Sequence, residues 1–98
     1  MKFDWDSAKA LLNEKKHGLS FEQAITAFDD PMALVAPDPK HSTLKEERQW
    51  LIGQTDLDTV VVVVFTDRED GKIRRIISAR SASRKERNTY ETLKRIPL

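Results

Sequence analysis

The chain has 98 residues, a length that suits one domain with a single hydrophobic core, and we expect one domain over residues 1–98. It contains no cysteine and two histidines, which excludes disulfides and a thiolate nucleophile and leaves few ligands for zinc, so we expect no metal and no other cofactor. The N-terminus is polar and acidic, and the longest apolar run, 60–65, is too short to cross a bilayer. We therefore expect a soluble, cytoplasmic protein with no membrane segment.

The N-terminal part predicts a short strand, "MKFDW", and then a helix. Asp6 or Ser7 can cap this helix, and Gly18 supplies a left-handed residue at its end. Its expected apolar face carries Ala8, Leu11 and Leu12.

A second helix is predicted to begin at Ser20. The segment "SFEQ" matches a capping box, in which the Gln23 side chain would reach back to the Ser20 backbone. An apolar stripe follows and ends at "DDP"; its members are Phe21, Ala24, Ile25 and Phe28.

The central part predicts four strands: "MALVAPD", "RQWLIGQT", "TVVVVVFTD" and "IRRIISAR". A proline-containing loop follows the first strand, and "DLD" and "REDGK" are predicted hairpin turns. The valine run is apolar on both faces, which predicts a central strand covered at least partly on both sides. Strict alternation in the last strand divides its residues between two faces, with Arg75, Ile77 and Ala79 on one and Arg74, Ile76, Ser78 and Arg80 on the other.

Ser83 and Glu86 form a second capping box, for a last helix that runs to about Arg95 and is stopped by Pro97. Its expected anchors are Tyr90 and Leu93, and a polar stripe carries Arg84, Arg87, Asn88 and Glu91. The order of elements is β-α-α-β-β-β-β-α. It predicts an α+β domain whose sheet is a largely antiparallel meander, with two N-terminal helices and one C-terminal helix.

Positive charge is concentrated near the C-terminus. Residues 72–95 contain nine Lys or Arg and two Glu, a net charge of +7, while the rest of the chain carries −6. This segregation favours a polyanion on one side and a basic partner on the other. Arginine holds phosphate through two parallel hydrogen bonds, so phosphate is the expected ligand. The alternative is a solvated helix face with surface ion pairs, each worth about 0–1 kcal/mol, which would not explain the segregation.

Seven segments form a specific pattern in their order and spacing: "FDWD" at 3–6, "KHG" at 16–18, "SFEQA" at 20–24, "FDDP" at 28–31, "ER" at 47–48, "IG" at 52–53 and "RIISARSASRKERNTYE" at 75–91. Together they resemble the BrnT-like toxins of bacterial toxin-antitoxin pairs, a branch of the RelE-like ribonuclease fold. The resemblance implies a single ribonuclease-toxin-like domain that cleaves RNA and inhibits translation. It also implies a ribbon-helix-helix antitoxin, a 2:2 heterotetramer, and binding of promoter DNA through the antitoxin.

Metal-independent cleavage of RNA needs a proton acceptor, a proton donor and positive charge beside the reacting phosphate. For phosphate stabilisation we expect Arg80 and Arg84. The residues expected to hold RNA are Arg48, Arg75, Arg87 and Lys16. Arginine is a poor proton donor because its pKa exceeds about 12, so the expected acid and base are among His17, Glu47 and Tyr90.

Each proton-transfer candidate has a structural alternative. His17 can complement a helix dipole, Tyr90 can anchor the last helix, and Glu47 can pair with a neighbouring arginine. Lys16 and His41 are weaker candidates, because exposed basic residues beside helices and loops need no special role. Two further residues, Trp5 and Trp50, can stack on RNA bases or fill the core, and we expect both in or near the core.

Two other functions fit the same residues. One is a non-catalytic nucleic-acid-binding module whose arginines only hold phosphate, which predicts salt-sensitive binding without strand scission. The other is an interaction subunit whose acidic N-terminal part receives a basic partner.

Overall fold

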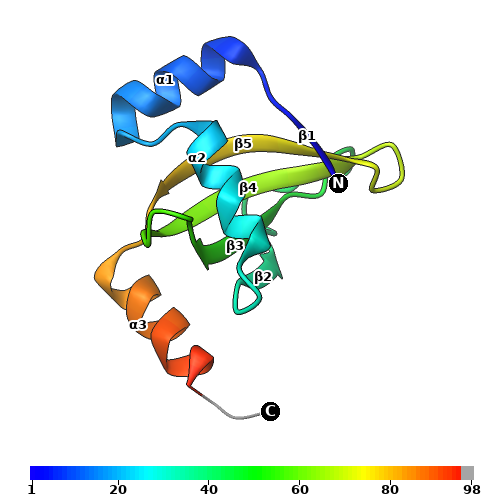
Figure 1. Cartoon of the computed structure of the whole chain (residues 1–98). Helices are drawn as coiled ribbons and strands as arrows, with labels where there is room; N and C mark the ends of the chain where they lie inside the picture. The colour runs from blue at the N-terminus through cyan, green and yellow to red at the C-terminus, as the bar shows by residue number, and fades with distance from the viewer. Residues whose placement is uncertain (96–98) are drawn as a thin grey trace.

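The computed structural model describes residues 1–95, and its five strands form one sheet in the order β1-β5-β4-β3-β2 (Figure 1). The strands are β1 (Lys2–Asp4), β2 (Leu34–Pro37), β3 (Gln49–Gln54), β4 (Val60–Arg68) and β5 (Ile73–Ser81). The helices are α1 (Ser7–His17), α2 (Phe21–Ala24), the 3-10 helix η1 (Ile25–Asp29) and α3 (Arg84–Lys94). Strands β2 to β5 are an antiparallel meander, and β1 joins β5 in parallel. The predicted α+β class and element order are therefore confirmed; Pro97 lies outside the described residues.

The ends of α1 are as predicted, but the expected apolar face is wrong. Asp6 caps the helix by accepting hydrogen bonds from two backbone amides, and Gly18 ends it with φ of 68°. Leu11 and Leu12 are each 67% exposed, and Ala8 is exposed as well.

The side of α1 that meets the sheet carries Asn13, which is buried. Its amide nitrogen donates to the carbonyls of Leu19 at 3.1 Å and Ala79 at 2.8 Å, and its oxygen accepts from the Ala79 amide at 3.1 Å. These bonds satisfy a buried amide side chain and fix the rotation of α1, which leaves the two leucines in solvent.

The apolar stripe of the second helix is confirmed, although the helix tightens into η1 after Ala24. Phe21 and Ala24 are fully buried, and Ile25 and Phe28 pack against the same core cluster. One of the two expected capping bonds is absent from the described residues. The Ser20 hydroxyl accepts from the Gln23 amide, but the Gln23 side chain donates instead to Asp56 in the β3–β4 turn, at 2.7 Å.

The valine run lies in the centre of the sheet, as predicted. Val61 and Val63 are fully buried on the face covered by α1, α2 and η1. On the other face, Val62 packs with Ile52 and Tyr90 of α3. In the neighbouring strand β3, Gly53 lets η1 lie close to the sheet, because a Cβ at this position would lie 3.0 Å from the carbonyl oxygen of Ala27.

A β-bulge in β5 changes which residues share a face. Val64 pairs with Ser78 and Phe65 pairs with Ile76, so Ile77 is the extra residue. The bulge places both Ile76 and Ala79 in the core under α1 and α2, which corrects the strict alternation expected from the sequence.

The alternation resumes on either side of the bulge. Arg74 faces the covered side, where its guanidinium lies 4.6 Å from the Phe65 ring centroid, so Arg75 faces the opposite side. Ser78 and Arg80 also face that opposite side. Arg75 and Arg80 therefore share one face, whereas the strict alternation expected from the sequence put them on opposite faces.

Candidate functional site

The face of the sheet that carries α3 is covered at one end and open over the rest. Tyr90 of α3 packs on Ile52 and Val62, and beyond it the strands surround a hollow of about 500 Å³. We call this the Trp50 hollow; the lining residues that matter below are Asp38, His41, Trp50, Ser78, Arg80 and Glu86. A smaller hollow, the Arg75 hollow, includes Lys9, Glu46, Arg48, Arg68 and Arg75. Because Arg48 and Trp50 are two residues apart, both belong to this open face.

Arg80 lies at the end of β5 and is held by Glu86 from the first turn of α3. Its two terminal nitrogens donate to the two Glu86 carboxylate oxygens at 2.7 and 2.9 Å. The same carboxylate accepts from the Ser83 amide, and the Ser83 hydroxyl accepts from the Glu86 amide, so the predicted capping box is confirmed. The hydrogen bond from Arg80, helped by those from Ser83, lowers the pKa of Glu86 to about 2 in spite of partial burial.

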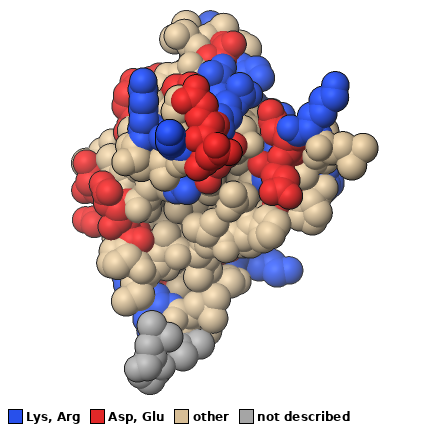
Figure 2. Space-filling view, turned by 90° about the vertical axis from the view of Figure 1, so that its right-hand side faces the viewer, with Lys and Arg blue, Asp and Glu red and all other residues tan. Residues whose placement is uncertain are grey.

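The arginines of the Arg75 hollow are also paired with carboxylates. Arg48 donates to Glu46 at 2.8 Å, and this hydrogen bond lowers the pKa of Glu46. Arg75 contacts Asp4 of β1 at 3.4 Å. Figure 2 shows one side of the molecule, and in its upper part basic and acidic side chains lie next to one another. Pairing in three dimensions thus offsets part of the charge segregation that exists along the chain.

Tyr90 is buried and holds α3 against the rest of the domain. Its hydroxyl donates to the Asp30 carboxylate at the end of η1. Burial, together with the Asp30 carboxylate, raises the pKa of Tyr90 above its ordinary value, so the phenol stays protonated. Burial works to raise the pKa of Asp30, but hydrogen bonds from Tyr90 and from the amides of Gln54 and Met32 outweigh it and lower that pKa. Tyr90 therefore anchors α3, whereas Leu93, the second expected anchor, is exposed.

The other expected proton-transfer residues do not gather around Arg80. His17 is exposed at the C-terminal end of α1, which lies along the β5 edge of the sheet, and Lys16 precedes it; neither residue lines the Trp50 hollow. Glu47 is exposed beside Thr66, whose hydroxyl donates to the Glu47 carbonyl. Thr66 is four residues along β4 from Val62, the pairing partner of Arg80, a separation of about 13 Å at a rise of about 3.3 Å per residue.

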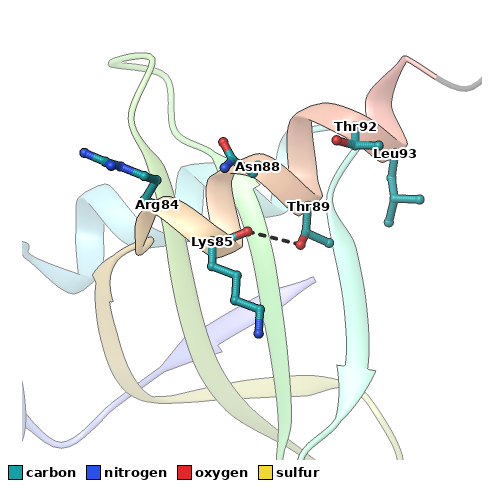
Figure 3. A pocket seen from close by; sticks show the side chains of 6 residues that line it. All are labelled: Arg84, Lys85, Asn88, Thr89, Thr92 and Leu93. Carbon is teal, nitrogen blue, oxygen red and sulfur yellow. Dashed lines mark hydrogen bonds between the residues drawn. The ribbon is translucent and has the colours of Figure 1, made fainter.

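A third, shallow hollow follows the exposed side of α3 (Figure 3). Arg84 and Lys85 lie at its start, and the Thr89 hydroxyl donates to the Lys85 carbonyl at 3.1 Å. Arg87 is exposed on the same helix. Among the described residues that line this hollow there are two cations and no carboxylate or imidazole, so it suits contact with a phosphate backbone better than proton transfer.

Two further residues line the Trp50 hollow: His41, which was a weaker candidate from the sequence, and Asp38, which was not predicted. The His41 Nδ1 lies 2.9 Å from a carboxylate oxygen of Asp38, in the loop between β2 and β3. The segment "DPKH" is a local signal for this turn, because Asp and Pro favour its first two positions. Trp50 is half-buried on the floor of the hollow, and Trp5 packs edge-on against Phe21 on the other face, so both tryptophans lie at the core as expected.

Within residues 1–95, no group of three or more His, Cys, Asp or Glu side chains is arranged to hold a metal ion. None of the helices in this described part combines the length and apolar character that crossing a bilayer requires.

The fold is that of a small α+β toxin of the ribonuclease type, as comparison with a solved structure shows. The structure is similar to the crystal structure of the Brucella abortus ribonuclease toxin, BrnT, with a TM-score of 0.66 and 29% sequence identity over 86% of this chain and 99% of that chain. The model of one family, the ribonuclease toxin, BrnT, of type II toxin-antitoxin systems, matches residues 5–86. The chain belongs to this family. Comparison with curated proteins finds no match.

Proposed function

We propose that this chain is a metal-independent endoribonuclease that inhibits translation by cutting RNA, and that residues 1–98 act as one domain. The observation that carries the proposal is the bulge at Ile77. It brings Arg75 and Arg80 to one open face of the sheet, where Arg48 also lies. A line of guanidinium groups along an open sheet suits a single RNA strand, because each group can hold a phosphate through two hydrogen bonds.

The roles follow from position. Arg80, in the larger hollow, stabilises the negative charge that develops on the phosphate during cleavage. Arg48 and Arg75 hold the strand on one side of it, and Arg84 and Arg87 on α3 hold it on the other. Lys16, His17 and Glu47 lie away from this hollow, and the buried Tyr90 supports the site by anchoring α3.

The test uses end-labelled RNA and refolded protein freed of antitoxin, in the presence of EDTA. The wild type should cut the RNA, and an Arg80→Ala/Arg84→Ala variant should lose most of the activity. Lys15→Ala is the matched control, because Lys15 is an exposed cation on α1 that lines neither the Trp50 hollow nor the Arg75 hollow. If the wild type leaves the RNA intact, the proposal is wrong. If the double variant cuts RNA as fast as the wild type, Arg80 and Arg84 do not belong to the site.

The arginines, which are paired with carboxylates, also fit a second function: a module that binds nucleic acid without cutting it. It predicts that log affinity falls linearly with log salt while the RNA stays intact. The same gels, run at several salt concentrations, separate the two functions.

A toxin of a type II system has an antitoxin, and we propose that this antitoxin is a ribbon-helix-helix protein in a 2:2 complex that binds promoter DNA through the antitoxin. Covering the open face is the simplest way to neutralise the arginines. Substitution of Arg75 and Arg80 should therefore weaken the complex, and substitution of the exposed acidic residues Glu14 and Glu22 on α1 and α2 should barely change it. A large loss from the acidic substitutions would refute this mode of binding.

A further inference from the structure

The loop after β2 places a histidine at the edge of the Trp50 hollow by a local turn. The His41 amide donates to the Asp38 carbonyl at 3.3 Å, which closes a four-residue turn with Pro39 in its second position. The Ser42 hydroxyl donates to the same carbonyl at 2.7 Å, and it accepts from the Arg48 amide at 2.8 Å. The Asp38 amide donates to the Arg48 carbonyl at 2.8 Å, so the turn is fastened to the start of β3.

None of those loop-closing bonds uses the side chain of His41 or of Asp38. These two side chains instead contact each other, Nδ1 to carboxylate oxygen at 2.9 Å. The Asp38 side chain is 12% exposed and the imidazole is 56% exposed, so a nearly buried carboxylate orients a ring that is open to solvent. A carboxylate at Nδ1 favours the tautomer with the proton on Nδ1, which leaves Nε2 free to accept a proton.

The imidazole, a phosphate-binding arginine and an aromatic ring line the same hollow. His41 comes from the β2–β3 loop, Arg80 from β5 and Trp50 from β3. The imidazole can accept a proton and the guanidinium can stabilise negative charge, two of the needs of RNA cleavage, and the aromatic ring offers a stacking surface that helps to bind a single strand. The other histidine, His17, lies at the end of α1, along the β5 edge of the sheet, and does not line this hollow.

We propose that His41 is the general base of the RNA cleavage proposed above, that Asp38 positions it, and that Trp50 stacks a nucleobase beside the scissile phosphate. The assignment rests on the proposed ribonuclease function. Nε2 of His41 takes the proton of the ribose 2′-hydroxyl while the 2′-oxygen forms a bond to phosphorus and the bond from phosphorus to the 5′-oxygen breaks. The 5′-oxygen leaves with the bonding electron pair and takes a proton from water, and His41 returns its proton to the solvent. The products are a 2′,3′-cyclic phosphate and a 5′-hydroxyl, with no net consumption of protons.

The experiment compares single-turnover cleavage of an RNA oligonucleotide by the wild type, His41→Gln, Asp38→Asn and the matched control His17→Gln. Binding is measured separately by fluorescence anisotropy with a 2′-O-methyl oligonucleotide of the same sequence, which cannot be cut. His41→Gln should lower the cleavage rate by about 10²–10⁴-fold, the range that general base catalysis contributes, with the dissociation constant changed by less than about twofold. His17→Gln should cut RNA like the wild type.

Two further measurements separate chemistry from loop structure. Added imidazole should restore part of the cleavage by His41→Ala, an effect that no purely structural role would give. Asp38→Asn should lower the cleavage rate at unchanged KM, because the turn remains while the ring loses its orienting charge.

The outcomes distinguish the assignment from the function on which it rests. Cleavage by His41→Gln at the wild-type rate, beside a wild type that cuts RNA, would overturn the role of His41 and leave the ribonuclease function standing. A wild type that leaves RNA intact would overturn both. Loss of cleavage with a matching loss of binding, and no recovery with imidazole, would also overturn the assignment.

Discussion

Glu86→Gln should raise the affinity of the protein for RNA while leaving the fold intact. In the free protein Arg80 is occupied by Glu86 through hydrogen bonds of 2.7 and 2.9 Å, and a phosphate must replace this carboxylate or share the guanidinium with it. The Arg80 and Glu86 side chains are 44% and 27% exposed, and ion pairs with such exposure contribute about 1 kcal/mol. Release of about 1 kcal/mol corresponds to a dissociation constant about fivefold lower.

The fold should tolerate this change because glutamine can still accept the hydrogen bond from the Ser83 amide that closes the capping box. The assay is fluorescence anisotropy with an uncleavable 2′-O-methyl RNA at one fixed salt concentration, since the affinity depends on salt. Glu91→Gln is the matched control, because it removes the same charge from an exposed position of α3. Unchanged or weaker binding by Glu86→Gln, relative to this control, would refute the competition between Glu86 and phosphate for Arg80.

Tyr90→Phe should lower the free energy of unfolding by about 1.5–3 kcal/mol in urea titrations, because it removes a hydrogen bond to the Asp30 carboxylate; a loss below about 0.5 kcal/mol would contradict the anchoring role. The pKa values of Asp30 and Glu86 are both lowered in the folded protein, so the stability that these carboxylates contribute is complete above their ordinary values of 3.8 and 4.5 and is lost as the pH falls. The melting temperature should therefore drop between about pH 4.5 and pH 2, and a flat profile there would argue against these interactions. Gly53→Ala should cost about 1–3 kcal/mol, because its Cβ would meet the carbonyl oxygen of Ala27 at 3.0 Å; a neutral result in the same urea titration would show that η1 can move aside.

The features that depend on neighbouring residues could be predicted from the sequence. Asp6, Gly18 and Ser83 mark helix ends because their side chains or backbone conformations act within one turn. The central position of the valine run also follows from the sequence, since a strand that is apolar on both faces needs cover on both.

The features that depend on distant partners could not be predicted. The rotation of α1 is set by hydrogen bonds between Asn13 and Ala79, which are 66 residues apart, and this outweighs the apolar stripe that includes Leu11. The bulge at Ile77 exists only in the pairing of β5 with β4, yet it decides which arginines share a face. The turn at Asp38 is visible in the sequence, but only the sheet register places it beside Arg80.

The contact between Asn13 and Ala79 also affects how another chain can approach the sheet. Strand β1 covers β5 only at Ile73–Arg75, and at Ala79 the Asn13 amide takes the backbone donor and acceptor that an added strand would use. The opposite edge strand, β2, is four residues long and ends at Pro37, which has no amide hydrogen to donate. Both edges therefore offer few backbone groups for pairing, so edge-to-edge pairing of copies of this chain is disfavoured. We expect a partner to bind a face of the sheet instead. On a face, side chains rather than backbone groups determine which partner binds.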